Sequence, residues 1–175
     1  LYGLADGQVL WGPEPDGPVA FTENGLHLEA NVLLGQKTGF FFDQRENRAR
    51  VEQLAEGQST LNVFSYTGGF SLYAARGGAP TVLSTDLSIP ALEAAERHFR
   101  LNLGHPRIAA AQHTTLAGDA FAILEELSSA GRRFGLVIVD PPSFAQSQAQ
   151  IPGALAAYAR LATLGLGVLA PEGTL

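Results

Sequence analysis

The sequence predicts an α/β protein of the Rossmann-like, doubly wound class, with a mostly parallel sheet preceded by a small β-rich segment. Three observations support this class. Short apolar runs alternate with stretches of helical periodicity from residue 59 onwards. The apolar run Leu61–Phe64 enters the glycine turn Thr67-Gly68-Gly69. Carboxylates stand where later runs end, and parallel strands bring their carboxyl ends to one edge of a sheet.

Composition fits one sizeable core, because 46% of the 175 residues are hydrophobic. No apolar run approaches the ~20 residues that span a bilayer, and no signal pattern is visible, so we expect a cytoplasmic protein without a membrane partner. The chain has no cysteine and four scattered histidines, which predicts no metal site and partner-satisfied or surface histidines. A homodimer is one assembly open to it.

The β-rich segment covers residues 1–40, where glycines and prolines separate short apolar pieces suited to hairpins. We interpret it as the end of a preceding domain and 41–175 as a cofactor-binding domain whose C-terminal part is incomplete. Helical spacing follows over 44–56. Asp43 is the expected N-cap of this helix, with Glu46 completing a capping box.

Strand and helix then alternate, which indicates βαβ units. Ser88 is the expected N-cap of the second of these helices, with Pro90 in its first turn. The most mobile loop is expected at Gln146–Gln150. The periodicity predicts strands over 59–64, 81–85, 113–117 and 134–139, and helices over 69–77, 88–102, 119–129 and about 154–169.

The glycine turn has the features of a ligand-binding loop. Gly68 and Gly69 tolerate positive φ and leave room for a ligand to approach the backbone. A helix starting near Phe70 would direct its free N–H groups at that ligand. Asp86 lies eighteen residues after Gly68, close to the spacing of roughly 20 at which a carboxylate binds ribose hydroxyls. A plain tight turn is the alternative.

Two further carboxylates, Asp119 and Asp140, follow later strands and would share the edge with Asp86. Asp119 could equally cap the helix that it opens. Asp140 begins the loop Asp140–Phe144, in which two prolines fix the backbone and remove two N–H donors. We expect this stiff loop to present Asp140 to the ligand and Phe144 to a flat base. The alternative is a rigid loop with Phe144 in the core.

Three motifs carry a family resemblance: GQKTGFFFDQRENR at 35–48, LNVFSYTGGFS at 61–71 and DPPSF at 140–144. They resemble the class I S-adenosylmethionine-dependent methyltransferases that modify large-subunit ribosomal RNA. They are most similar to the 5-methylcytosine branch that carries an N-terminal PUA domain. The resemblance covers nearly the whole chain, and it implies S-adenosylmethionine as cofactor and ribosomal RNA as partner.

The resemblance also implies residue roles. The methionine end of the cofactor would contact Phe64, Ser65, Tyr66, Thr67 and Gly68. The ribose and adenine would contact Asp86, Leu87, Ser88, Asp119 and Ala120. Asp140, with Pro141, would lie beside the sulfonium and position the base and the methyl group. The substrate side would comprise Pro142, Ser143 and Phe144, together with Lys37, Gln44 and Arg45, which serve either RNA contact or cofactor closure.

Methylation of cytosine carbon 5 needs a thiolate that adds at carbon 6, and this chain has no cysteine. We expect that nucleophile beyond Leu175, after a strand beginning at Gly173, in a protein whose PUA domain and C-terminal end lie outside this sequence. The alternative is methylation of a ring nitrogen of guanine, which needs no covalent intermediate.

Two other function classes are less well supported. An NAD-dependent oxidoreductase should show a G-x-G-x-x-G loop after the first strand, and that pattern is missing. A non-catalytic RNA-binding module would need a broader basic surface than the net charge of −6 provides. Binding of S-adenosylhomocysteine rather than NAD would separate these classes from a methyltransferase.

Overall fold

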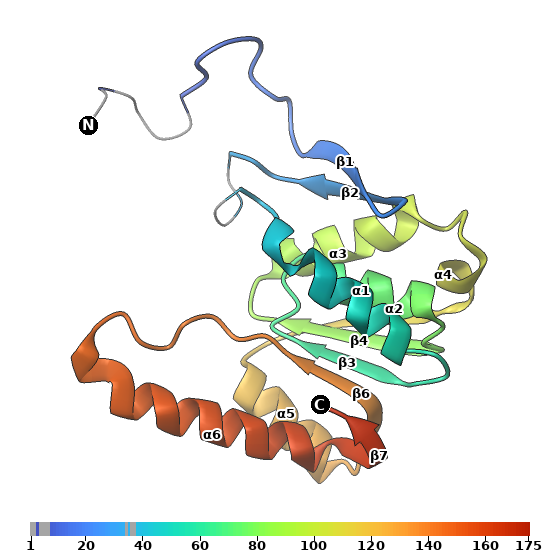
Figure 1. Ribbon diagram of the computed structural model, residues 1–175, viewed down its shortest axis with the longest axis vertical. Helices are drawn as coiled ribbons and strands as arrows, with labels where there is room; N and C mark the ends of the chain where they lie inside the picture. The colour runs from blue at the N-terminus through green and yellow to red at the C-terminus, as the bar shows by residue number, and fades with distance from the viewer. Residues whose placement is uncertain (1–2, 4–7, 34, 36–37) are drawn as a thin grey trace. The chain divides into compact units, whose positions relative to one another are not determined.

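The computed structural model describes residues 3, 8–33, 35 and 38–175 (Figure 1). The chain divides into two compact units, Leu1–Arg45 and Glu46–Leu175. The sequence placed this division at residue 40, a few residues earlier.

An antiparallel hairpin forms the first unit. Strand β1 (Val19–Glu23) pairs with β2 (Leu26–Ala30) so that Glu23 faces Leu26 across the turn. The two turn residues, Asn24 and Gly25, have φ angles of 49° and 81°. Positive φ at both positions is the requirement of the two-residue turn whose twist matches a hairpin, and Asn-Gly is its preferred sequence.

Three phenylalanines close the small core of this unit. The ring of Phe40 is 4% exposed and lies 5.0 Å from the ring of Phe21 and 5.5 Å from that of Phe42, measured between centroids. Leu28, 1% exposed, belongs to the same strand pair. Such edge-to-face aromatic packing lets a short hairpin bury apolar surface.

The entry into the first helix differs from the prediction. A 3-10 turn, η1 (Phe42–Gln44), precedes α1 (Arg45–Leu54). Asp43 therefore lies inside the turn, whose N-cap is Phe41, and no side chain caps it. The predicted Asp43 capping box is wrong because the chain begins to coil before Asp43, which takes this carboxylate out of the N-cap position.

The second unit is built on a five-stranded sheet in the order β5-β4-β3-β6-β7. All four neighbouring pairs are parallel. This confirms the predicted parallel α/β class. The strands are β3 (Thr60–Val63), β4 (Thr81–Asp86), β5 (Gln112–Ala117), β6 (Phe134–Val139) and β7 (Leu169–Thr174).

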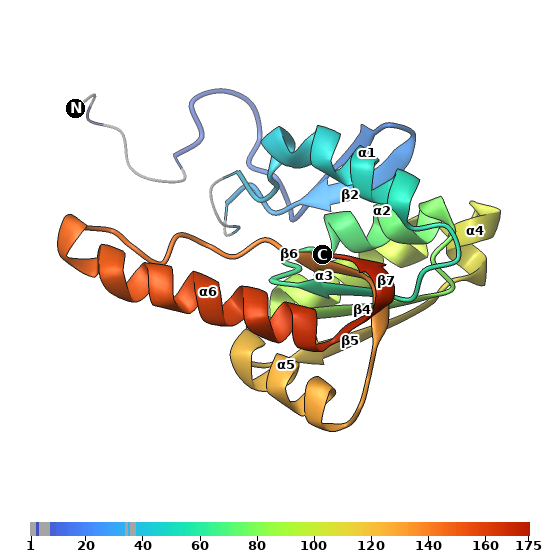
Figure 2. The same ribbon diagram turned by 60° about the horizontal axis from the view of Figure 1, so that its bottom comes forward.

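Helices cover both faces of this sheet. Figure 2 shows α1, α2 and α3 on one face, and α5 and α6 on the other. No helix in the described part of the chain is long and apolar enough to cross a membrane. The helices after α1 are α2 (Gly69–Gly77), α3 (Ile89–Leu101), α4 (Pro106–Ala110), α5 (Ala120–Ser129) and α6 (Ile151–Gly167), with a 3-10 turn η2 (Gln148–Gln150) before α6.

The bounds of α2 and β6 coincide with the predicted ranges, whereas three features differ. The five-residue α4 was not predicted. Helix α6 begins at Ile151, before the predicted 154, and Pro152 is accommodated in its first turn, where no N–H partner is needed. The strand expected to begin at Gly173 begins at Leu169 and includes Pro171, which an edge strand such as β7 tolerates.

The main core lies between the sheet and α5. Leu61 and Val63 of β3 are fully buried against Leu124 of α5 and Leu161 of α6. On the other face the central strands carry polar side chains, among them Asn62. The two faces of β3 thus have different chemistry, one apolar and one polar.

Candidate ligand-binding site

The three predicted carboxylates follow three strands of one parallel sheet. Asp86 is the last residue of β4, Asp119 comes shortly after β5, and Asp140 directly follows β6. The loop after β3 lies between the ends of β4 and β6, because β3 pairs with both strands. A ligand at this edge would therefore meet the loop and the carboxylates together.

The loop after β3 has an unusual backbone. Phe64, Tyr66 and Gly68 have φ angles of 60°, 47° and 73°. For the two residues other than glycine this left-handed conformation is uncommon, and such strain clusters at ligand sites. The Ser65 N–H donates to the Thr85 carbonyl at 2.9 Å, and the Gly68 N–H donates to the Ser65 carbonyl at 2.8 Å. The loop is therefore fixed to β4 and turned tightly.

Asp86 holds this loop from the side. Its Oδ2 accepts a hydrogen bond from the Tyr66 N–H at 2.8 Å, and its Oδ1 accepts from the Ser88 N–H at 2.9 Å. A carboxylate has about four acceptor sites, so the side chain can still accept hydroxyl donors. Asp86 thus links the loop to the start of α3, a structural role that the sequence did not reveal.

Gly68 is required by the packing of α3. A Cβ atom on Gly68 would lie 2.6 Å from the Cβ of Ala95, closer than two carbons can pack. Together with the left-handed φ, this contact explains the glycine without any ligand. Gly69, predicted to serve the turn in the same way as Gly68, is the first residue of α2. Ser88 caps α3 as predicted, accepting from the Ala91 N–H.

A buried histidine holds the loop from below. His98 of α3 is fully buried, and its Nδ1 lies 2.8 Å from the Thr67 carbonyl oxygen. A carbonyl only accepts, so Nδ1 carries the proton. The Asn102 side chain donates to the His98 carbonyl at 2.7 Å. The sequence predicted that each histidine lies at the surface or is satisfied by a partner, and His98 is the second case. It did not identify the partner, because residues 67 and 98 meet only in the fold.

A chain of polar side chains runs beneath the site across three strands. Asn62 Nδ2 donates to Ser71 Oγ at 2.9 Å, and Ser71 Oγ is joined to Ser84 Oγ at 2.7 Å. Ser84 Oγ is joined in turn to His113 Nε2 at 2.8 Å. This chain of hydrogen bonds connects β3, α2, β4 and β5, and we refer to it as the polar chain.

His113 ends the polar chain in an apolar setting. Its ring stacks on Phe99 with centroids 3.8 Å apart and planes 2° from parallel. Burial lowers the pKa of His113 to about 4, while the negative charge of Glu96 opposes this shift. His113 is therefore neutral near pH 7.

Three buried polar atoms near the ends of β3 and β4 have no hydrogen-bond partner in the described part of the chain: Asn62 Oδ1, Ser65 Oγ and Thr85 Oγ1. Leaving such a group unsatisfied costs about 1–3 kcal/mol. They belong to the penultimate residues of two strands and to the loop itself. A polar ligand or a water molecule at the carboxyl edge would offer them partners.

Asp119 caps α5, because its Oδ1 accepts from the Ala122 N–H at 3.0 Å. The predicted capping alternative is thus realised, and the side chain is exposed. Ala120, next to it, is buried. Leu87 directly follows Asp86 and is 78% exposed, which leaves an apolar surface beside the carboxylate.

The loop Asp140–Phe144 is tied to α6 through one hydroxyl. Tyr158 Oη donates to the Pro142 carbonyl at 3.4 Å and accepts from the Phe144 N–H at 3.3 Å. Ser143 Oγ donates to the Ala145 carbonyl at 2.9 Å. Asp140 is exposed, and Pro141 is half-buried. The sequence did not point to Tyr158, which lies sixteen residues after Pro142.

Phe144 packs in an aromatic cluster. Its ring centroid lies 4.8 Å from that of Tyr158, 6.2 Å from Phe121 and 6.4 Å from Phe64. The side chain is half-buried against the main core. The packing alternative considered for Phe144 is therefore present, and only its remaining exposed part could meet a base.

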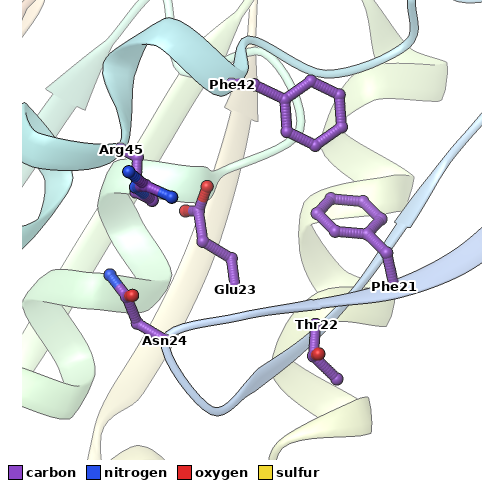
Figure 3. A pocket seen from close by; sticks show the side chains of 6 residues that line it. All are labelled: Phe21, Thr22, Glu23, Asn24, Phe42 and Arg45. Carbon is purple, nitrogen blue, oxygen red and sulfur yellow. The ribbon is translucent and has the colours of Figure 1, made fainter.

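Of the three upstream residues predicted to contact RNA or close over the cofactor, Lys37 lies outside the described residues. Gln44 and Arg45 end the first unit. Arg45 lines a pocket of that unit, shown in Figure 3, with an empty volume of about 370 Å³ including the solvent at its mouth. The pocket is lined by Phe21, Thr22, Glu23, Asn24, Phe42 and Arg45.

Within the described ranges, no group of three or more histidine, aspartate or glutamate side chains is placed to hold a metal ion.

Comparison with known proteins gives one family. A family model described as S-adenosylmethionine-dependent methyltransferase matches residues 6–175. A "Ribosomal RNA large subunit methyltransferase" of Deinococcus radiodurans is 53% identical over 173 residues, which is 99% of this chain and 41% of that protein. A "Ribosomal RNA large subunit methyltransferase I" of Pseudoalteromonas translucida is 40% identical over 167 residues, 95% of this chain and 41% of that protein.

Solved structures agree on the fold. The crystal structure of SMU.776 complexed with SAH (S-adenosylhomocysteine) has a TM-score of 0.80 and 31% identity, covering 94% of this chain and 42% of that one. The SAM-dependent methyltransferase from Agrobacterium tumefaciens has a TM-score of 0.74 at 21% identity. The match covers 91% of this chain and 51% of that chain. The chain spans about two fifths of the length of the curated relatives it matches, 41% in each of the two named above.

Proposed function

Because the chain belongs to the S-adenosylmethionine-dependent methyltransferase family, we propose that it binds this cofactor at the carboxyl edge of its sheet and methylates large-subunit ribosomal RNA. The observation that carries the proposal is the Asp86 carboxylate, which ends β4 and holds the left-handed loop after β3. The names of the relatives from D. radiodurans and P. translucida support ribosomal RNA as the substrate.

The residues at this edge fit such a cofactor. Asn62, Ser65 and Thr85 each have a buried polar atom without a partner in the described part of the chain, and a polar ligand would satisfy such atoms. Asp86 retains acceptor sites for two ribose hydroxyls. The exposed Leu87 offers an apolar surface for a purine ring. Of the remaining candidates, Phe64, Tyr66, Thr67 and Gly68 would hold the methionine end, and Ser88, Asp119 and Ala120 the adenine end.

S-adenosylmethionine, when bound, supplies a methyl group attached to a positively charged sulfur. Asp140 and Pro141 would orient the incoming base beside it, since the proline fixes the backbone that carries the carboxylate. Pro142, Ser143 and Phe144 would line the substrate side of the same loop. Tyr158 holds that loop through Pro142 and Phe144, so the loop enters the reaction already ordered.

Cytosine carbon 5 is the target that we propose, with PUA-containing 5-methylcytosine methyltransferases as the functional model. That reaction needs a thiolate, and the chain contains no cysteine. The relatives are longer, with 41% of their length matched here, so the thiolate would belong to the remaining part of such a protein. The alternative target is a ring nitrogen of guanine, where Asp140 and backbone carbonyls would orient the base and no thiolate is required.

Lys37, Gln44 and Arg45 would contact the RNA or close over the cofactor. We further propose a cytoplasmic location, because ribosomal RNA is modified there, and a homodimer as the assembly to test. Light scattering coupled to size exclusion measures that assembly directly: a single mass equal to the chain mass would exclude the dimer.

Cofactor binding is tested first, by isothermal titration calorimetry of the chain with S-adenosylhomocysteine and with NAD. We expect binding of S-adenosylhomocysteine and none of NAD. Binding of NAD alone would instead support an oxidoreductase. Binding of neither, while RNA binds, would support a non-catalytic RNA-binding module.

The target base is tested with the longer protein, because the proposed thiolate lies outside this chain. Large-subunit RNA is incubated with methyl-labelled S-adenosylmethionine, digested to nucleosides and separated by chromatography. Label in 5-methylcytidine supports the carbon reaction, and label in a methylated guanosine supports the nitrogen reaction. Label in no nucleoside of this RNA would refute the proposed substrate.

A further inference from the structure

We propose that the pocket of the first unit, lined by Phe21, Thr22, Glu23, Asn24, Phe42 and Arg45, binds one unpaired base of the RNA substrate. The inference rests on the proposed function, since it takes RNA as the ligand. It adds a second contact, distinct from the carboxyl edge of the sheet, and it concerns a base that is held rather than methylated.

One wall of the pocket is aromatic and partly open. Phe42 is 54% exposed, although its ring lies 5.4 Å from the ring of Phe21 and 5.5 Å from that of Phe40. Phe40 is 4% exposed, so the ring of Phe42 rests on a buried support while more than half of the side chain stays accessible. A fixed, open aromatic ring is the surface on which single-stranded bases stack.

The other wall consists of planar polar groups. Figure 3 shows the two phenyl rings on one side and the Arg45 and Asn24 side chains on the other, with the Glu23 carboxylate between them. Glu23 is 7% exposed, whereas Arg45 is exposed. Carboxylate oxygens can each accept more than one hydrogen bond, so Glu23 can serve a ligand in addition to protein neighbours.

The charges favour a base over a phosphate. Glu23 and Arg45 carry opposite charges, so the polar wall is neutral as a whole. A phosphate would be attracted by Arg45 but repelled by Glu23. A neutral heterocycle can instead stack on Phe42 and donate an amino N–H to Glu23, as cytosine N4 does to acidic side chains. Adenine, cytosine and guanine have such an amino group, and uracil has none.

The pocket is ordered before any ligand arrives. Glu23 ends β1, and the Asn24-Gly25 turn joins it directly to β2 with both residues left-handed. A two-residue turn of this kind fixes the register, so Glu23 is held opposite Leu26. Preorganisation of this kind reduces the entropy lost on binding.

The experiment measures binding of the full 175-residue chain to fluorescently labelled single-stranded RNA decamers of one base each, by fluorescence anisotropy. The variants are Phe42→Ala, which removes the ring, and Phe42→Tyr, which keeps it. Val19→Ala is the matched control, because Val19 lies on the same hairpin, is 42% exposed and does not line the pocket. Affinity for S-adenosylhomocysteine is measured for every variant.

We expect Phe42→Ala to weaken binding of the adenine and cytosine decamers about tenfold or more, the scale of one lost base stack. Phe42→Tyr and Val19→Ala should bind as the parent chain does, and the uracil decamer should bind weakest. The ratio between parent and Phe42→Ala should be the same at low and high salt, because stacking releases no counterions. Affinity for S-adenosylhomocysteine should be unchanged throughout.

Parent-like RNA binding by Phe42→Ala would overturn this inference and leave the proposed methyltransferase function standing. An equal loss of RNA affinity in Phe42→Ala and Val19→Ala would also overturn it. Failure of the parent chain to bind any decamer would also overturn it, whereas the proposed function is judged separately by S-adenosylhomocysteine binding and by methylation of ribosomal RNA.

Discussion

His98 Nδ1 lies 2.8 Å from the carbonyl oxygen of Thr67, so a fully buried side chain of α3 fixes the backbone of the loop after β3. Asp86 fixes the same loop through the Tyr66 N–H, and Ala95 contacts it at Gly68. Three neighbours thus hold a loop in which two residues other than glycine, Phe64 and Tyr66, have positive φ.

Replacing His98 by leucine should lower the affinity for S-adenosylhomocysteine about tenfold, because the Thr67 carbonyl loses its donor and the loop can shift. His98→Asn should restore most of the affinity, since the asparagine amide can donate from nearly the position of Nδ1. Isothermal titration calorimetry measures both variants.

Leu124→Ala provides the control for His98. It opens a cavity in the core on the opposite face of the sheet and should destabilise the fold by about 2–5 kcal/mol without changing ligand affinity. If His98→Leu and Leu124→Ala lowered affinity equally, His98 would be a structural residue only.

Replacing Asp86 by alanine should weaken S-adenosylhomocysteine binding by about 1–3 kcal/mol, the scale of hydrogen bonds to a charged group. It should also lower the free energy of unfolding, because the N–H groups of Tyr66 and Ser88 lose their acceptor. Urea titration gives the second quantity. Asp119→Ala is the comparison for stability: it removes one helix cap and should cost about 0.5–2 kcal/mol of unfolding free energy. Unchanged affinity in Asp86→Ala would refute the ribose role.

Replacing Gly68 by alanine should destabilise the fold by about 2–5 kcal/mol, since it combines a left-handed residue with overpacking against Ala95. The double variant Gly68→Ala with Ala95→Gly removes the steric part and leaves the backbone part. Thermal unfolding of the parent chain, the two single variants Gly68→Ala and Ala95→Gly, and the double variant measures the coupling between the two positions. Strictly additive effects would show that the 2.6 Å approach does not matter energetically.

The free energy of unfolding should rise with pH between about 4 and 6.5. The pKa of His113 is about 4 in the folded chain, below the 6.5 of an ordinary histidine, so in this interval the unfolded chain binds more protons. The stabilisation is complete above pH 6.5 and is lost as the pH falls towards 4, by up to about 3 kcal/mol. Urea titrations across this range test it.

His113→Phe should flatten that part of the pH profile, because the titrating group is gone while the stack on Phe99 remains. A profile of His113→Phe as steep as that of the parent chain would assign the effect to other groups.

Local pattern was enough to predict most of the sheet. The apolar run at β6 and the glycine turn before α2 determine those elements from neighbouring residues alone. The same holds for the caps at Ser88 and Asp119, which bond to N–H groups three residues away. The prediction that Asp43 is an N-cap failed because the 3-10 turn η1 begins at Phe42, one residue before Asp43.

The contacts that shape the site could not be predicted from such local patterns. Thr67 and His98 are separated by 31 positions, and Ser84 and His113 by 29. No periodicity pairs them, because the pairing depends on how α3 and β5 pack on the sheet. Phe144 shows the same limit, since one aromatic residue after two prolines can face a ligand or a core, and its three ring neighbours come from distant elements.

The polar chain from Asn62 through Ser71 and Ser84 to His113 has a consequence for cooperativity. Its members belong to four different elements, β3, α2, β4 and β5, so detaching any one of these elements breaks at least one of the three hydrogen bonds that join them. Such elements open together as one foldon. In native-state hydrogen exchange, the backbone amides of β3 and β4 should therefore exchange only through global unfolding, with a single common free energy.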